Sequence, residues 1–203
     1  KDLHLDGLTP DYEIAKKTIN ELNIPVFILI RPREGDFNYS NEEFELMKAD
    51  IVKFKEMGCK GIVCGILNDD KTIDLERTKE LVELTRPLEF TFHRAFDSCL
   101  DLQNNLEDII KTGCDYLLTS GQYSNVNKGL ENIAQLIKIS KSRITILAGG
   151  GVNHKNIHEL YSAGVRQFHL SGSKTDKFGK SETNFNLIKQ AVNSFNEINE
   201  MSN

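Results

Sequence analysis

The sequence lacks any long hydrophobic run, which sets the first limit on what the protein does. Its longest apolar stretches, such as Ile24–Ile30, are far shorter than the roughly 20 residues that cross a bilayer as a helix. No charged segment followed by an apolar segment opens the chain as a secretion leader would. We therefore expect neither membrane insertion nor secretion, and no membrane partner.

Cysteine is scarce and is not spaced as in common metal sites. The chain has only Cys59, Cys64, Cys99 and Cys114, each in or beside an apolar stretch and none in a C-x-x-C pattern. This usage is typical of reduced thiols, which predicts a cytoplasmic location. The five-residue separation of Cys59 and Cys64 is not a recurrent ligand spacing, so we favour a core role for these cysteines over a metal pair.

A basic stripe is also missing. The formal net charge is -5, and the Lys, Arg, Asp and Glu residues are interspersed along the chain, which argues against nucleic acid as a partner. Of the 203 residues, 39% are hydrophobic and 27% are charged, which is close to the globular average. The composition predicts one folded domain over residues 1–203 with a sizeable core.

Strand-like and helix-like segments alternate along the chain. Helical spacing of apolar residues is clear at Phe44, Met47, Ile51 and Phe54. Start signals are Thr9-Pro10 and the capping box Ser40–Glu43. The predicted strands share short apolar runs rich in β-branched and aromatic residues: Ile24–Arg31, Gly61–Leu67, Glu89–Phe96, Tyr116–Gly121, Ile144–Gly149 and Gln167–Ser171.

Alternation of this kind demands parallel strands joined by right-handed crossovers, in an open doubly wound sheet or a closed barrel. The polar residues Glu89, Thr91 and His93 share one parity, and Phe90 and Phe92 the other. A polar face and an apolar face fit a barrel with its lumen on one side and helices on the other. An open sheet would bury both sets under helices at a cost in free energy, so we favour the barrel.

Arginines follow the first predicted strand, at the edge where barrel active sites lie. Arg31 and Arg33 share a parity, and a guanidinium presents a fork of donors that matches carboxylate or phosphate oxygens. We therefore predict both as anion-binding residues. The alternative is a structural network that closes the barrel mouth, in which these arginines pair with carboxylates such as Glu89 or Asp97.

A histidine, an arginine and a carboxylate follow one another at the end of the strand from Glu89. His93 is a candidate general acid or base, or a metal ligand, and Asp97 a candidate partner that orients its ring. Arg94 is a further candidate for binding an anion. The alternative is an interior histidine whose hydrogen bonds are satisfied by the fold.

The most specific signal of a ligand site is a pair of glycine-containing loops at successive strand ends, Gly149–Gly151 and Ser171–Ser173. Gly149, Gly150 and Gly151 follow the penultimate strand and lead toward a helix, so their N–H groups and the helix N-terminus are predicted to cradle an anion. Glycine runs also form plain tight turns, which is the alternative. The neighbouring strand ends add further candidate ligand-binding residues, namely Ser120, His169 and Ser171.

The segment from Lys174 to Ser181 has three lysines and is predicted to be a loop over the barrel mouth. An ordinary solvated linker is the alternative.

Several strings together resemble the CutC copper-homeostasis family. They are Gly7–Pro10, the run from Ile30 to Ser40, Gly65–Leu67, the run from Thr91 to Asp97, Leu118–Gly121, Gly149–Gly151 and Phe168-His169. The resemblance spans almost the whole chain. It implies a TIM-type (β/α)8 barrel of which six strand–helix units are present, with the family's first two strands expected upstream of Lys1. It also implies a cytoplasmic homo-oligomer, with a dimer favoured, and copper as the associated metal.

The resemblance leaves the metal ligands unknown. Cysteines proposed as copper ligands in some family members belong to the two strands expected upstream of Lys1. Where some relatives have a cysteine in the last strand, this chain has Leu170. Thiolates are the ligands that Cu(I) prefers, and this chain offers no good thiolate constellation.

Two functions follow from this reasoning. The first is copper homeostasis with copper binding, which rests on the resemblance. The second is an enzyme that acts on a small phosphorylated or otherwise anionic metabolite at the carboxyl ends of the strands, with the arginines as the anion clamp.

Overall fold

The structure, a computed structural model, describes residues 7–175 and 181–201. The chain forms two compact units, Lys1–Leu117 and Leu118–Asn203, and the boundary falls inside a single strand. Each unit is described by itself. The prediction of one domain over residues 1–203 stays a prediction.

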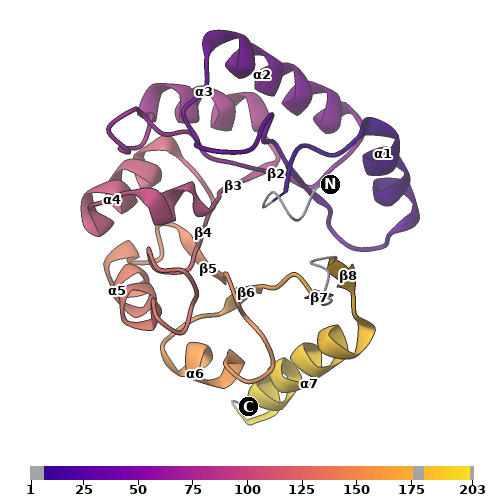
Figure 1. Ribbon diagram of the computed structural model, residues 1–203, viewed down its shortest axis with the longest axis vertical. Helices are drawn as coiled ribbons and strands as arrows, with labels where there is room; N and C mark the ends of the chain where they lie inside the picture. Colours follow the sequence, from indigo (N-terminus) through magenta and orange to yellow (C-terminus); the bar gives the residue numbers. More distant parts are fainter. Residues whose placement is uncertain (1–6, 176–180, 202–203) are drawn as a thin grey trace. The chain divides into compact units, whose positions relative to one another are not determined.

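The first unit alternates helices and parallel strands. In Figure 1, helices α2, α3 and α4 lie along one side of strands β2 and β3. The elements are α1 (Tyr12–Glu21), β1 (Phe27–Leu29), α2 (Asn41–Glu56), β2 (Gly61–Cys64), α3 (Leu75–Thr85), β3 (Glu89–Phe92), a short 3-10 helix (Arg94–Ser98), α4 (Leu102–Thr112) and the first half of β4 (Tyr116–Thr119).

Local sequence signals explain where these helices begin. The predicted capping box at α2 is confirmed: the Glu43 N–H donates to Ser40 Oγ, and the Ser40 N–H donates to the Glu43 carboxylate. The predicted cap at Thr9 is wrong, because α1 begins after Asp11. Thr9 Oγ1 instead accepts a hydrogen bond of 2.9 Å from the Arg31 N–H. This hydroxyl therefore ties the entry to α1 to the end of β1.

The two faces of the sheet in the first unit differ as the parity of the sequence predicts. One face of these strands is almost fully buried: at most 1% of the surface is exposed at Ile62 and Cys64 on β2 and at Phe90 and Phe92 on β3. The predicted helical stripe of α2, from Phe44 to Phe54, is buried as well. On the opposite face of β3, Glu89 is half-buried and the polar Thr91 is buried, so the two faces differ in the kind of side chain that they carry. The large apolar side chains thus supply the core.

The second unit continues the same pattern. It holds the end of β4, α5 (Leu130–Ser140), β5 (Thr145–Gly149), α6 (Ile157–Ser162), β6 (Gln167–His169), β7 (Ser173–Thr175), β8 (Ser181–Thr183) and α7 (Phe185–Met201). On β6 the Phe168 ring packs edge-on against Phe195 of α7, with ring centroids 5.8 Å apart. Gln167 and His169, of the opposite parity, are exposed.

The segment predicted as a loop from Lys174 to Ser181 differs from that prediction at both ends. Ser173–Thr175 and Ser181–Thr183 pair as two short antiparallel strands. Residues 176–180 lie outside the described residues. The prediction of a plain loop is therefore wrong for the ends of this segment.

Strand pairing follows the order β1-β2-β3-β4-β5-β6. The registers of β1–β2, β2–β3, β3–β4 and β5–β6 are parallel. An α-helix follows β1, β2, β4 and β5, and the 3-10 helix and then α4 follow β3, as the predicted (β/α)-barrel fold requires. After β6 the chain forms β7 and β8 before it enters α7. Every strand ends earlier than predicted or at the predicted residue, because its last residues form the turns that carry the polar groups. Among the described residues, no helix has the length and apolar character that crossing a membrane requires.

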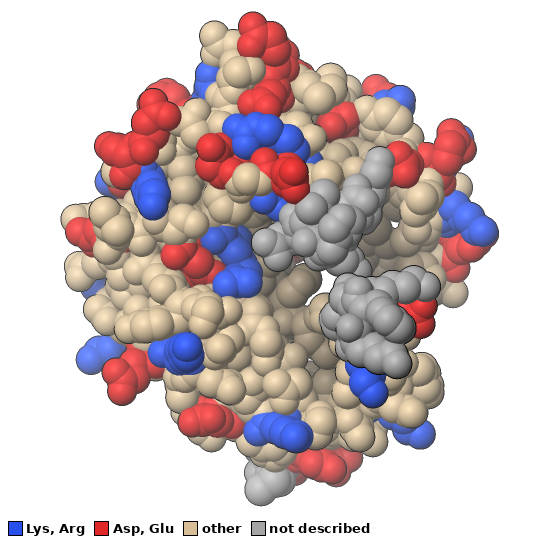
Figure 2. Space-filling view, in the orientation of Figure 1, with Lys and Arg blue, Asp and Glu red and all other residues tan. Residues whose placement is uncertain are grey.

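Figure 2 shows one face of the molecule, on which acidic and basic side chains alternate. This pattern agrees with the interspersed charges in the sequence.

Candidate anion-binding site at the ends of β1, β2 and β3

Arg31 lies at the end of β1 and is buried, with 5% of its surface exposed. The preceding residue extends the strand pairing, since the Ile30 N–H donates to the Val63 carbonyl over 2.9 Å. The Arg31 guanidinium donates to two glycine carbonyls, Gly7 O at 3.2 Å and Gly35 O at 3.1 Å. These bonds fix a permanent positive charge inside the first unit, at the carboxyl end of the sheet.

His93 follows β3 and is buried as well, with 6% exposed. Its N–H donates to the Cys64 carbonyl at 2.9 Å, which places it beside the end of β2. Its ring nitrogen Nδ1 accepts a hydrogen bond of 3.2 Å from the Ala95 N–H. The other ring nitrogen, Nε2, is buried and has no hydrogen-bond partner among the residues that the structure describes.

Gly65, the residue after β2, makes room for this imidazole. A Cβ atom at Gly65 would lie 2.6 Å from His93 Nδ1 and 2.7 Å from its Cε1. No larger residue fits here without moving the ring. The His93 ring is therefore held on one side by the Gly65 backbone and at Nδ1 by the Ala95 amide.

Phe37 brings the arginine and the histidine together. It lies in the loop between β1 and α2, where its carbonyl accepts a hydrogen bond of 2.9 Å from the Leu67 N–H. The Arg31 Cζ atom lies 5.1 Å from the centroid of the Phe37 ring, and the His93 ring centroid lies 4.9 Å from it. Arg31 and His93 thus lie against the same aromatic side chain, that of Phe37.

Burial sets the charge state of His93. Burial first, and the positive charge of Arg31 second, lower the pKa of the imidazole from 6.5 to about 3. Because this pKa lies far below neutrality, the ring is uncharged at pH 7. The site therefore combines one fixed cation with one neutral, polar ring.

Arg33 takes part in a network within the turn that leads to α2. Its Nε donates to the Glu43 carboxylate at 2.7 Å, and its Nη2 to the Asp36 carboxylate at 2.8 Å. Its guanidinium also lies 5.2 Å from the Tyr39 ring. The two carboxylates raise the pKa of Arg33, with Asp36 giving the largest effect. Arg33 therefore lies in a structural network, with Asp36 and Glu43 as its partners and not the expected Glu89 or Asp97. Anion binding by Arg33 stays a prediction.

Asp97 pairs with Arg94 rather than with His93. The Arg94 Nε atom lies 2.7 Å from the Asp97 carboxylate, and both residues belong to the 3-10 helix Arg94–Ser98. Since Nδ1 of His93 accepts from Ala95 and its Nε2 has no partner, the expectation that Asp97 orients the ring is wrong. A local backbone amide was not foreseen as the group that holds the imidazole.

In the second unit, Ser120 follows β4 and is fully buried. Its hydroxyl donates to the carbonyl of Tyr123. The loop that it begins is packed backbone against backbone, because a Cβ atom on Gly129 would lie 1.8 Å from the Ser120 carbonyl oxygen. Ser120 therefore has a structural role in this turn, and ligand contact through it stays a prediction.

The glycines after β5 serve close packing and a turn. A Cβ atom on Gly149 would lie 2.5 Å from Leu118 and 3.3 Å from His169, so this glycine lets neighbouring strands approach. The Gly150 carbonyl accepts a hydrogen bond of 2.9 Å from the Val126 N–H. The Gly151 carbonyl accepts from side-chain amides: from Asn153 at 2.8 Å and from Asn156 at 3.0 Å.

The expected helix N-terminus does not follow these glycines directly. Helix α6 begins at Ile157, and it has only six residues. The predicted combination of glycine amides with a helix N-terminus is therefore wrong in its second part. Anion binding by Gly149, Gly150 and Gly151 themselves stays a prediction.

His169 and Ser171 are exposed in the second unit. His169 ends β6 beside Gly149, and the Ser171 hydroxyl accepts a hydrogen bond of 3.4 Å from the Ser173 N–H. Their predicted contact with a ligand stays a prediction.

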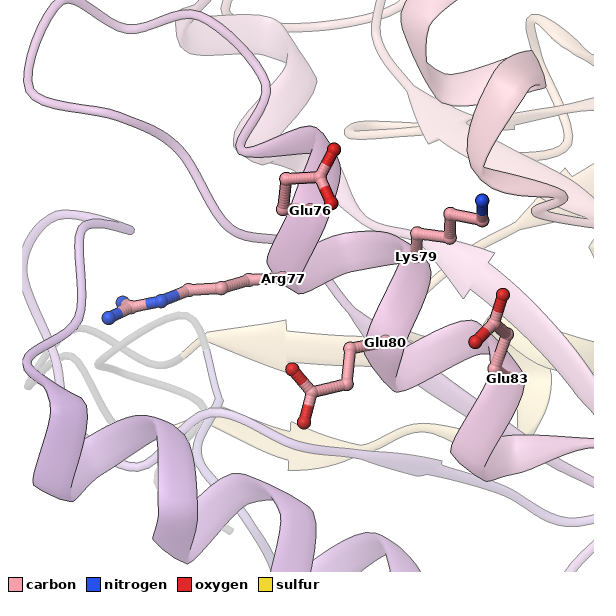
Figure 3. Close-up of a pocket in the computed structure, with 5 residues that line it drawn as sticks. All are labelled: Glu76, Arg77, Lys79, Glu80 and Glu83. Carbon is pink, nitrogen blue, oxygen red and sulfur yellow. The ribbon is translucent and has the colours of Figure 1, made fainter.

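A hollow on the surface of the first unit is lined by side chains of α3 alone (Figure 3). Its lining is charged and consists of Glu76, Arg77, Lys79, Glu80 and Glu83. In Figure 3 these side chains point in different directions from the helix. They do not converge on a common point, so this hollow has none of the features of a binding site.

The thiols do not fit a copper centre. All four cysteines are buried. Burial raises the pKa of both Cys64 and Cys114 to about 12, so these thiols stay protonated at pH 7, whereas thiolates are the copper ligands. In the part of the chain that the structure describes, no three His, Cys, Asp or Glu residues are grouped as metal ligands would be.

Comparison with known proteins decides the family. The model of the CutC family matches residues 1–174. This chain belongs to the CutC family. A CutC protein of Vibrio cholerae serotype O1 is 44% identical over 176 residues, which cover 85% of this chain and 69% of the relative. A CutC protein of Pasteurella multocida is 41% identical over 171 residues, which cover 84% of this chain and 70% of that relative.

Solved structures confirm the predicted fold of this CutC chain. The crystal structure of a copper homeostasis protein CutC from Streptococcus agalactiae matches with a TM-score of 0.79 and 30% identity, over 83% of this chain and 84% of that one. An aldolase matches with a TM-score of 0.61 and 16% identity, over 77% of this chain and 73% of that one, which shows a shared fold alone. The TIM-like class of fold predicted from the sequence is thus confirmed.

Sequence reasoning missed three residues of the Arg31–His93 site. Phe37, Gly65 and Ala95 carry no titratable group, so their side chains give no sign of a chemical role in the sequence. Phe37 and Gly65 lie in strings that resemble the family, and Ala95 lies between the singled-out residues Arg94 and Asp97. Periodicity gives no signal for them, because each acts through a local contact outside the strands.

Proposed function

We propose that this CutC chain binds a small anionic metabolite, phosphorylated or carboxylated, at the ends of β1, β2 and β3. One observation carries the proposal: Arg31 and His93, both buried, converge on the Phe37 ring within about 5 Å of its centroid. A buried cation attracts an anion strongly, because little water screens its charge. Ends of parallel strands are also where barrel proteins bind their ligands.

Phe37 is the residue that must move for a ligand to enter. Its ring lies against both Arg31 and His93, and Nε2 of His93 is out of contact with solvent. The Phe37 side chain is itself half-buried, and it sits in a loop rather than in a strand. We expect a rotation of this side chain to open Arg31 and His93 to a ligand.

Thermal unfolding of the full chain in inorganic phosphate, and separately in acetate, tests the proposal. We expect a rise in melting temperature that saturates with phosphate concentration, because a ligand that binds the native state stabilises it. Arg31→Gln should weaken phosphate binding by about tenfold or more, since the charge is lost. Arg31→Lys is the matched variant. Arg31→Lys keeps the positive charge, so its affinity for phosphate should fall less than that of Arg31→Gln. Equal affinity of all three proteins would contradict the proposal.

Copper homeostasis is the second function that we propose for this chain. The relative from Streptococcus agalactiae is named a copper homeostasis protein. We propose that this chain serves copper homeostasis in the cytosol, as a homodimer. Direct copper binding through its own buried thiols is not favoured by their raised pKa values.

A Cu(I) titration against a competing chelator tests that last point. We expect the full chain and its double variant, Cys64→Ser with Cys114→Ser, to bind Cu(I) equally, because these thiols are buried and protonated. Stoichiometric binding that the double variant loses would show a thiolate copper site and overturn the expectation.

A further inference from the structure

The hydrogen bonds of His93 determine which of its ring nitrogens carries the proton. A neutral imidazole has one N–H donor and one acceptor nitrogen. The Ala95 N–H donates to Nδ1, so Nδ1 is the acceptor. The proton therefore lies on Nε2, the nitrogen that is buried without a partner.

This tautomer limits what His93 can do. Nε2 carries a proton, so it has no lone pair with which to take up a proton or bind a metal ion. Nδ1 has a lone pair, but it is engaged with the Ala95 amide. General-base and metal-ligand roles for His93, both open from the sequence, are thus disfavoured by the same hydrogen bond. The remaining role is donation from Nε2–H.

We propose that His93 is the hydrogen-bond donor of the Arg31–Phe37–His93 site, and that its Nε2–H recognises an unprotonated oxygen of the ligand. The oxygen belongs to a carbonyl, carboxylate or phosphate group. This inference rests on the proposed function, which supplies the anion.

Three features support a ligand as the missing acceptor. A buried donor without a partner costs free energy, and native structures rarely keep one unless something else satisfies it. The ring cannot turn to find another acceptor, because Gly65 and the Ala95 amide hold it in place. Arg31 lies on the same aromatic ring, so an anion drawn to its charge would bring oxygen atoms toward Nε2–H.

The charged groups around His93 favour the neutral donor. The packed neighbours Gly65, Phe37 and Ala95 are uncharged, and Arg31 is the charge that acts on the ring. On its own segment, Arg94 and Asp97 neutralise each other as an ion pair. A positive neighbour disfavours protonation of the imidazole, so the ring keeps its donor nitrogen and its acceptor nitrogen at physiological pH.

Nitrogen NMR of the full chain, labelled at histidine, tests the tautomer directly. We expect a pyrrole-type signal for Nε2 and a pyridine-type signal for Nδ1 of His93, unchanged between pH 7 and pH 5. Addition of inorganic phosphate should shift the Nε2–H signal. A pyridine-type Nε2, an imidazolium at pH 6, or an Nε2–H signal that saturating phosphate leaves in place would each overturn the inference.

A pair of variants separates this inference from the proposed function. His93→Gln keeps an N–H donor near the position of Nε2, and His93→Met has similar length without a donor. We expect phosphate binding within about threefold of the unaltered chain for Gln, and about tenfold weaker for Met. If both His93 variants weaken phosphate binding equally, or neither weakens it, while Arg31→Gln still weakens binding by about tenfold or more, the donor role is defeated and the proposed function stands. Absence of phosphate binding by the unaltered chain would defeat both.

Discussion

Gly129→Ala is expected to lower the free energy of unfolding by about 3 kcal/mol or more. The added Cβ atom would lie 1.8 Å from the Ser120 carbonyl oxygen. The facing Gly121 is also tightly packed, since a Cβ atom there would lie 2.3 Å from the Gly129 carbonyl oxygen. These are contacts with backbone, which cannot rotate away as a side chain can. The two backbone segments of the loop after β4, at Ser120 and at Gly129, must therefore move apart. Chemical denaturation monitored by circular dichroism measures the change.

Gly58→Ala is the matched control for that substitution. Gly58 has a φ of +87°, and nothing lies within 4 Å of a Cβ atom there. Gly58→Ala therefore introduces backbone strain without a clash. We expect it to lower the free energy of unfolding by about 1 kcal/mol. Gly129 itself has a φ of -94°, which alanine adopts freely, so the effect at Gly129 is a clash alone. Equal effects of the two substitutions would show that the two backbone segments do not pack as described.

The free energy of unfolding of the full chain is expected to fall as the pH drops below 6.5. His93 contributes about 1.4 kcal/mol of this loss for each pH unit. The pKa of His93 is lowered from 6.5 in an unfolded chain to about 3 in the fold. Between these values the unfolded chain binds a proton and the native one does not. Acid therefore favours unfolding in this window, and the stabilisation by neutral His93 is complete above pH 6.5.

His93→Gln isolates this effect from the carboxylates, which titrate at lower pH. The variant should lose the slope between pH 6.5 and pH 5, a difference of about 2 kcal/mol across that interval relative to the unaltered chain. Urea denaturation at a series of pH values measures both slopes. Parallel curves for the two proteins would mean that His93 titrates normally in the fold, and hence that it is not buried beside Arg31.

The parts of the fold that follow from one repeating pattern were predictable from the sequence. Apolar spacing located α2, and the parity of Glu89 and Phe90 assigned the two faces of β3, because burial acts on every residue of a strand or helix in the same way. The Ser40 capping box was also readable, since its two hydrogen bonds join residues three apart.

The site was only partly predictable, because it depends on contacts between segments. Arg31 and Arg33 look alike in the sequence, yet Gly7 and Gly35 carbonyls hold the first and two carboxylates hold the second. Asp97 stands near His93 in sequence but pairs with Arg94. The geometry of the turns after β1 and β3 determines which partners these side chains have. The preferences of single residues do not predict that geometry.

A crystal structure of the full chain grown with inorganic phosphate would test the central claim most directly. We expect a phosphate ion at the ends of β1, β2 and β3, with one oxygen within hydrogen-bond distance of His93 Nε2, a second near the Arg31 guanidinium, and the Phe37 ring turned aside. Phosphate bound only at Gly150 and Gly151, or Phe37 still closed over His93 at a phosphate concentration that saturates the thermal shift, would contradict the account.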